Sequence, residues 1–224
     1  PLVNIGIYVV IFSKVMGAKL PGQSITYSYS IYLVAGLVPW IAFSNTVSRS
    51  TTVFVDNKNI LSKIAVPFIL LPLSVALSES ITFLISMVFF CVFLLLTGKA
   101  LHVVLLYIPV IFLVQQLFAF SLGFLMAVFN VFLRDLKEAV GVVVQLWFWV
   151  TPIVYTLDIV PESLQGVFLY NPALLFVRSY QNIFLYNTSP AFHHLMLLGG
   201  LSISLLILAI YIFRKLEKDM RDFL

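Results

Sequence analysis

Few residues in this chain carry catalytic or metal-binding side chains, and their spacing fits no reactive constellation. The histidines are His102, His193 and His194. Adjacent residues on a helix point about 100° apart, so His193 and His194 are poorly placed to share a metal ion. Cys91 is the only cysteine, which excludes a disulfide within the chain and a cysteine-built metal site. We therefore expect no catalytic residue, metal or cofactor in this chain, and we interpret the histidines as polar caps of apolar segments.

Thr97–Lys99 contains a Gly-Lys pair of the kind found in phosphate-binding loops. The earlier glycine and the following Ser or Thr of such a loop are absent from the sequence around it. We expect that the chain does not bind ATP by itself.

Glu79 is an acidic residue inside an apolar segment. Counted from Pro67, it lies about 18 Å along its helix, where an ionised side chain costs about 2.5 to 3.5 kcal/mol. The carboxyl could face a wet conduit or a proton site, or it could be held by partners such as Gln115 and Gln116. Because a proton relay needs a second buried titratable group, we favour a structural or conduit-facing role over proton coupling.

The composition indicates a membrane protein. Of 224 residues, 62% are hydrophobic and 10% charged, with a mean hydropathy of +1.09, whereas soluble domains are about half apolar and a quarter charged. The net charge is +4, but the basic residues lie singly at the ends of apolar runs. This distribution favours membrane orientation over nucleic-acid binding, and we expect no nucleic-acid partner.

Hydropathy predicts an all-α integral membrane protein with six spans. Each must cover about 20 residues to cross a core of about 30 Å. The candidate spans are residues 1–16, 29–48, 68–96, 103–132, 139–155 and 195–213. We interpret 1–16 as a first span that lacks its upstream part. No internal repeat or linker is evident, so 1–224 is expected to form one transmembrane domain.

Lysines and arginines predict the orientation of these spans. If the tail from Arg214 is cytoplasmic, nine basic residues lie inside and four outside. This arrangement obeys the positive-inside rule and places both termini in the cytoplasm. The four outside residues are Lys14, Lys19, Lys99 and Arg178.

Two connections are expected to contain short helices. The inside loop 56–67 has an N-cap candidate at Asp56, apolar residues at Ile60 and Leu61, and a terminating Pro67, which predicts a two-turn amphipathic helix at the cytoplasmic surface. The outside stretch 158–187 is broken by prolines, which predicts two short helices that dip into the membrane and return. These helices should start near Pro161 and Pro172.

Aromatic residues follow one face of the second span. Steps of three or four residues connect Tyr29, Tyr32, Gly36, Trp40 and Phe43. A rail of rings suits stacking against sugar rings, but the same residues could simply fill contacts between helices, and both alternatives remain open. The tyrosines near outer span ends, including Tyr155, fit an interfacial belt. Trp40, Trp147 and Trp149 fall near mid-span instead.

Four segments of this sequence resemble the membrane subunit of ABC-2 type exporters, in the branch that exports O-antigen and related lipid-linked polysaccharides. The resemblance covers essentially the whole chain. Its most specific parts are the turn Phe132–Asp135 and the run Trp149–Tyr155. The four segments are Tyr29–Trp40, Asn130–Val140, Phe148–Tyr155 and Tyr170–Pro172.

The resemblance implies six spans per subunit, a homodimer in the bacterial inner (plasma) membrane, and a separate ATPase subunit that binds ATP and Mg²⁺. It implies an ATPase-coupling helix formed by Asp56, Asn57, Lys58, Asn59, Ile60, Leu61, Ser62 and Lys63. It implies a polysaccharide channel near the aromatic residues, and we assign Tyr29, Tyr32, Trp40, Phe43, Glu79, Trp147, Trp149 and Tyr155 to it. It implies outer gate elements that include Pro161, Tyr170, Asn171, Pro172 and Arg178. The amphipathic interface helix with which the family begins is not found in this sequence.

We therefore predict the permease subunit of an ATP-driven exporter of a lipid-linked polysaccharide, without enzymatic activity of its own. Within the same superfamily the alternative is export of teichoic acid, capsule, lipid or drug. From other classes, a proton-coupled secondary transporter would depend on Glu79, and a membrane glycosyltransferase would need clustered cytoplasmic acids. The acids expected on the inside, Asp56, Asp135 and Glu138, are scattered over separate loops.

Overall fold

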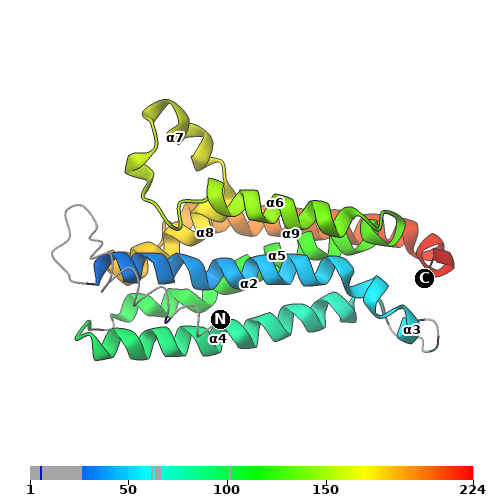
Figure 1. The fold of residues 1–224 in the computed structure, drawn as a ribbon, viewed down its shortest axis with the longest axis horizontal. Helices are drawn as coiled ribbons and strands as arrows, with labels where there is room; N and C mark the ends of the chain where they lie inside the picture. The colour runs from blue at the N-terminus through cyan, green and yellow to red at the C-terminus, as the bar shows by residue number, and fades with distance from the viewer. Residues whose placement is uncertain (1–5, 7–26, 62, 64–66, 101, 224) are drawn as a thin grey trace. The chain divides into compact units, whose positions relative to one another are not determined.

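The fold is known from a computed structural model, which describes residues 6, 27–61, 63, 67–100 and 102–223 (Figure 1). Apart from Gly6, the predicted first span lies outside the described residues. Every regular element within the described ranges is a helix, which confirms the all-α prediction. The α-helices are α2 (Ser28–Asp56), α3 (Lys58–Leu61), α4 (Leu70–Leu96), α5 (Ile108–Phe132), α6 (Leu136–Val150), α7 (Glu162–Leu169), α8 (Pro172–Gln181) and α9 (Phe192–Phe223). Two 3-10 helices, η2 (Val103–Tyr107) and η3 (Leu157–Ile159), and a π-helix, η4 (Asn182–Tyr186), complete the elements.

Four stretches of the described chain are long and apolar enough to cross a membrane. They are α2, α4, η2 with α5, and most of α9, with lengths of 29, 27, 30 and 30 residues. α4 and α9 leave many large apolar side chains exposed, including Leu77, Val88 and Ile207 at 58%, 62% and 63%. Such surfaces suit contact with lipid.

α2 is longer than the apolar run that predicted it. Hydropathy predicted an end near Ser48, because Arg49 and three hydroxyl residues follow, but the helix continues to Asp56. No glycine or proline interrupts this stretch, and Val53 and Phe54 are buried in the core. Packing of these two side chains favours the extra two turns despite the polar residues before them.

α6 is shorter than predicted. The expected span 139–155 corresponds to a helix of 15 residues that ends at Val150. A residue before proline avoids the helical conformation, so Thr151, which precedes Pro152, marks the end of the helix. Thr151 accepts a backbone hydrogen bond from Ile153 at 2.7 Å as the chain turns. A 15-residue helix is about 22 Å long, less than a hydrocarbon core of about 30 Å. That the chain has six membrane spans stays a prediction.

The chain divides into two compact units, each made of three segments. Unit 1 contains the described residues within 1–41, 82–112 and 148–194, and unit 2 contains those within 42–81, 113–147 and 195–224. α2, α4, α5, α6 and α9 each contribute residues to both. That 1–224 forms one domain stays a prediction.

Aromatic contacts hold the core of unit 2. Phe54 packs edge-on against Phe68 and Phe124, with ring centroids 5.3 and 6.3 Å apart, and α9 adds Phe213 at 5.4 Å from Phe124. α5 comes close to α2 at Gly123, where an added Cβ would lie 2.7 Å from the Cβ of Ser50. A side chain at this position would therefore separate the two helices.

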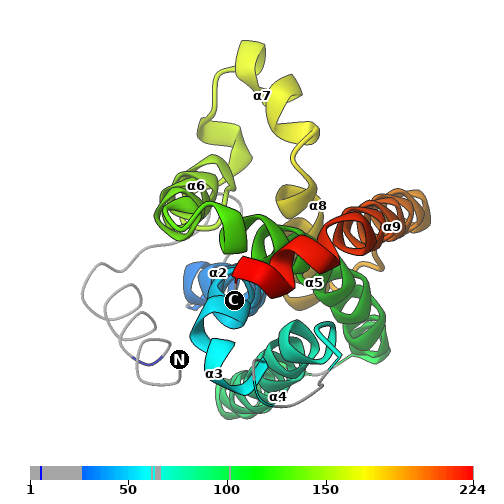
Figure 2. The same ribbon diagram turned by 90° about the vertical axis from the view of Figure 1, so that its right-hand side faces the viewer.

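In unit 1, α8 is largely buried. Its residues Ala173–Val177 are all buried, and Tyr180 is completely inaccessible. Phe83 of α4 stacks on Phe112 with ring centroids 3.9 Å apart and also meets Tyr180. α7 differs from α8, because it projects away from α8 and from the first turns of α2 in both views (Figure 1, Figure 2).

Candidate functional site

In the described part of the predicted ATPase-coupling segment, Lys58–Leu61 form one helical turn, α3, whereas residues 62 and 64–66 of the loop lie outside the described residues. Asp56 is the last residue of α2 and does not cap a surface helix, so this detail of the prediction is wrong. The break falls at Asn57, whose side-chain amide donates to the carbonyl of Val53 at 2.8 Å and so satisfies the end of α2. α3 lies where the chain passes from α2 towards α4 (Figure 1, Figure 2).

Ile60 and Leu61 face different environments in this turn. The side chain of Ile60 is exposed to 46%, whereas Leu61 is partly buried and packs against the core of unit 2. Leu61 therefore anchors the turn, and Ile60 is free to enter an apolar groove of a partner. Asp56, Lys58, Asn59 and Lys63 are also exposed, and Ser62 lies outside the described residues.

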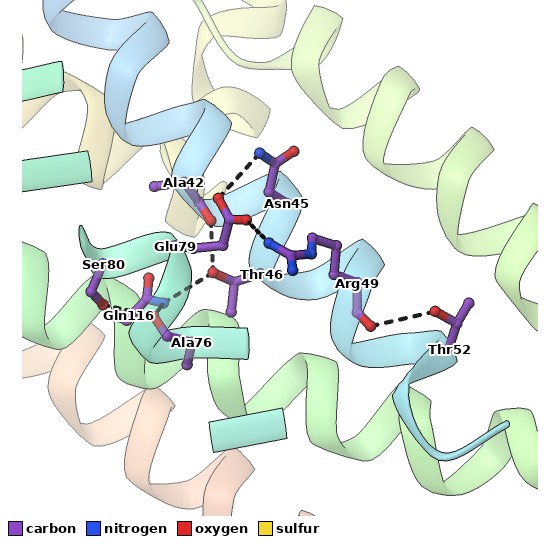
Figure 3. Close-up of polar contacts among 9 residues, drawn as sticks. All are labelled: Ala42, Asn45, Thr46, Arg49, Thr52, Ala76, Glu79, Ser80 and Gln116. Atoms are coloured by element: carbon purple, nitrogen blue, oxygen red, sulfur yellow. Dashed lines mark hydrogen bonds and ion pairs between the residues drawn. The ribbon is translucent and has the colours of Figure 1, made fainter. Parts of the chain in front are cut away.

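Glu79 is the centre of a buried polar cluster in unit 2 (Figure 3). Its carboxylate forms an ion pair with the guanidinium of Arg49 and accepts a hydrogen bond of 3.2 Å from the Nδ2 of Asn45. The side chain of Glu79 is 5% exposed and that of Arg49 is 54% exposed. The pair therefore joins α4 to α2, with its acidic member enclosed and its basic member accessible.

Gln116 continues this cluster from α5. Its Nε2 donates to the hydroxyl of Thr46 at 3.0 Å and to the carbonyl of Ala76 at 2.9 Å, so that one amide connects α5 with both α2 and α4 (Figure 3). The Thr46 hydroxyl in turn donates to the carbonyl of Ala42 at 2.8 Å. The side-chain oxygen of Gln116 is buried and has no hydrogen-bond partner among the described residues.

These contacts revise the expected surroundings of Glu79. The sequence suggested Gln115 and Gln116 as its partners, but Arg49 and Asn45 hold the carboxylate instead. Arg49 is one of the nine basic residues that the orientation prediction places inside. A carboxylate held by an arginine and an amide is suited to fixing two helices together. That Glu79 has a structural or conduit-facing role, and not one in proton coupling, stays a prediction.

Tyr29 and Tyr32 of the aromatic face are hydrogen-bonded within unit 1. The hydroxyl of Tyr29 donates to the carbonyl of Val154 at 2.6 Å. That of Tyr32 reaches the carbonyls of Pro152 and Tyr155 at 3.0 and 2.9 Å. These bonds fix the turn that follows α6.

Trp40 and Phe43 are buried, with exposed fractions of 5% and 3%. In unit 1, Trp40 meets Phe148 at 5.8 Å between centroids. In unit 2, Phe43 meets Trp147 edge-on at 5.3 Å and stacks on Phe118 at 5.9 Å. Within this chain the contacts favour the packing alternative for these rings, and a channel-lining role stays a prediction.

Trp149 is the exception, since 59% of its side chain is exposed. The backbone carbonyl of this residue accepts a hydrogen bond of 2.7 Å from the hydroxyl of Tyr155. Trp149 is therefore the aromatic residue of the predicted channel set that remains most available to a ligand or a second subunit.

The two predicted short helices are present as α7 and α8. α7 begins directly after Pro161 and α8 begins at Pro172, where Asn171 accepts a hydrogen bond of 3.0 Å from the backbone of Ala173. Tyr170 is 90% exposed and Arg178 is exposed. That these helices enter the membrane or gate a channel stays a prediction.

Lys99 has a structural contact that the sequence did not predict. Its ammonium donates to the carbonyls of Phe184 and, at 3.3 Å, Leu185 in η4. Partial burial lowers the pKa of Lys99. Among the described residues, no three His, Cys, Asp or Glu side chains come together as a metal site would require.

Comparison with known proteins assigns the chain to a family. The family described as ABC-2 type transporter matches residues 1–185. A curated O-antigen export system permease protein RfbA from Klebsiella pneumoniae is 30% identical over 225 residues, which is 100% of this chain and 84% of that protein. The protein of the same name from Myxococcus xanthus is 31% identical over 226 residues, which is 99% of this chain and 84% of that protein.

Proposed function

This chain belongs to the family of ABC-2 type transporters, and we propose that it is the membrane subunit of an ABC exporter for O-antigen. The observation that carries the proposal is similarity over the whole chain, at about 30% identity, to permeases named for O-antigen export. The four long apolar helices are consistent with a multi-pass membrane protein.

The energy for export comes from a separate ATPase subunit that binds ATP and Mg²⁺. The exposed Ile60 on α3, held in place by the anchored Leu61, supports docking of this turn in a groove of that subunit. ATP binding and hydrolysis bias the permease only through contacts that differ between the states of the ATPase. The chain itself then acts as a transport subunit and not as an enzyme.

Two copies of the chain form the conduit, in the bacterial inner membrane and with both termini in the cytoplasm. α6 supports this assembly, because most of its side chains are exposed and several are large and apolar, including Val143, Leu146 and Trp149. The substrate is a lipid-linked polysaccharide of the O-antigen type.

Deletion of the gene tests the proposal in the source organism. We expect O-antigen to disappear from the cell surface while lipid-linked polysaccharide accumulates inside, and we expect the intact gene on a plasmid to restore display. Surface O-antigen at the normal level in the deletion strain would contradict the proposal.

A further inference from the structure

Unit 1 contains a cavity of about 280 Å³ that is lined by both polar and apolar residues. It is lined from the turn after α6, from α8 and η4, and from α2. The polar residues that line it are Tyr32, Thr156, Asp158, Arg178, Gln181, Asn182 and Tyr186. Its volume lies just below the range of about 300 to 1,000 Å³ that is typical of small-molecule sites, so it can hold only a small part of a polymer.

The cavity runs from an exposed rim to a buried floor. Asp158, Arg178 and Tyr186 are exposed, whereas Tyr32 and Gln181 are only 8% and 4% exposed. A ligand can therefore enter from the rim and be enclosed at the floor.

Contacts within unit 1 hold the residues of the floor in place. Tyr32 and Gln181 both donate to the carbonyl of Pro152, at 3.0 and 3.4 Å. Gly36 allows α2 to approach α8 closely, because an added Cβ would lie 3.0 Å from the Nε2 of Gln181. Lys99 holds η4 through the carbonyl of Leu185 at 3.3 Å. Such pre-organisation lowers the entropic cost of binding.

The two charged residues of the rim, Asp158 and Arg178, restrict the class of ligand that the cavity can bind. Neither Asp158 nor Arg178 forms an ion pair with another described residue, so both are available to a ligand. A phosphate group would be attracted by Arg178 but repelled by Asp158. An apolar chain would remove water from both charges without replacing their hydrogen bonds, which is unfavourable.

A sugar matches this wall in donors, acceptors and shape. Each hydroxyl both donates and accepts, so it can pair with the acceptor-only carboxylate of Asp158, the donor-only guanidinium of Arg178 and the amide of Asn182. The exposed ring of Tyr186 adds a face for the C–H surface of a sugar ring. We propose that this cavity binds a small part of the exported polysaccharide, with Asp158 and Arg178 as its recognition groups. The identity of the ligand rests on the proposed function.

The test measures sugar binding by the complex of the full chain with its ATPase subunit in lipid nanodiscs. The probe is the oligosaccharide released by mild acid from the O-antigen of the source organism, titrated by calorimetry. Asp158→Asn and Arg178→Gln should each weaken binding about tenfold or more, because each removes a charged hydrogen-bond partner. The matched controls Asp219→Asn and Arg214→Gln change exposed charges on α9 and should bind like the wild type.

Unchanged affinity in both cavity variants would overturn the inference, as would displacement of the oligosaccharide by inorganic phosphate at a similar concentration. Tyr186→Leu keeps an apolar side chain at a residue 53% exposed, so it tests the cavity even if a charge variant fails to fold. Loss of affinity in this variant supports the site, and wild-type affinity contradicts it. If deletion of the gene abolishes display while all cavity variants bind normally, only this inference fails. If display survives deletion, the proposed function fails.

Discussion

Replacing Arg49 with leucine is expected to destabilise unit 2 more than replacing Glu79 with leucine. The reason is the unequal burial of the ion pair, in which the Arg49 side chain is 54% exposed and that of Glu79 is 5% exposed. Without Arg49, an enclosed carboxylate keeps, among the described residues, only Asn45 as its hydrogen-bond partner. Without Glu79, the guanidinium remains accessible, and its long side chain can reach the membrane surface.

The expected magnitudes follow from this asymmetry. Removal of one member of a buried ion pair costs about 3 to 5 kcal/mol. Because Arg49 is half exposed, we expect about 2 kcal/mol for Arg49→Leu, and under about 1 kcal/mol for Glu79→Leu. At about 2 to 4 °C per kcal/mol, Arg49→Leu should lower the unfolding temperature by about 4 to 8 °C. The double variant replaces both charges with apolar groups and should unfold above the Arg49→Leu single variant.

Thermal unfolding of the purified chain in detergent, followed by tryptophan fluorescence, measures these effects. Arg134→Leu is the matched control, because Arg134 is exposed and forms no ion pair among the described residues. It should change stability by less than about 0.5 kcal/mol. The reasoning is refuted if the effects of Arg49→Leu and Glu79→Leu simply add in the double variant, or if Glu79→Leu is the more damaging change.

Three further tests by substitution address other parts of the structure. Ile60→Asp should lower export per ATP hydrolysed without changing the unfolding temperature, because Ile60 is exposed and a charge is unfavourable in an apolar docking groove; unaltered coupling would argue against docking. Trp40→Leu should lower the unfolding temperature and Trp149→Leu should not, because Trp40 is buried against Phe148 and Trp149 is 59% exposed. Equal shifts in the unfolding temperature of the two variants would show that burial does not determine how much each ring contributes to stability. Gly123→Ala should cost about 1 to 3 kcal/mol in thermal unfolding, since its Cβ would lie 2.7 Å from the Cβ of Ser50, and Ser50→Gly should relieve the clash. If Ser50→Gly does not restore the stability of the Gly123→Ala variant, contact between these two side chains is not the cause of the loss.

The sequence predicted those helices whose position and ends depend on residues close by in the chain. The apolar run 68–96 predicted α4 to within two residues, and the run 103–132 predicted η2 and α5 together rather than one α-helix. Asn171 followed by Pro172 predicted the start of α8, because a cap side chain and a proline at the first position act within one turn. Pro152 was the available signal for the early end of α6, but the apolar run through it concealed that end.

Contacts between helices could not be predicted in the same way. The partner of Glu79 depends on how α2 and α4 are rotated against each other, and hydropathy does not report rotation. The span predicted from hydropathy ended near Ser48 and therefore left out Arg49, which belongs to α2. For the same reason the aromatic face of α2 could be found by its spacing, whereas its burial against residues of α6 could not.

The most direct test of the central claim is transport of lipid-linked O-antigen in inverted inner-membrane vesicles that contain the chain and its ATPase subunit. Polysaccharide that enters the lumen becomes protected from an added glycosidase. We predict that protection requires ATP and is abolished when the chain is omitted or the ATPase cannot hydrolyse. Equal protection without ATP, or protection driven by a proton gradient alone, would contradict the assignment of this chain to an ATP-driven O-antigen exporter.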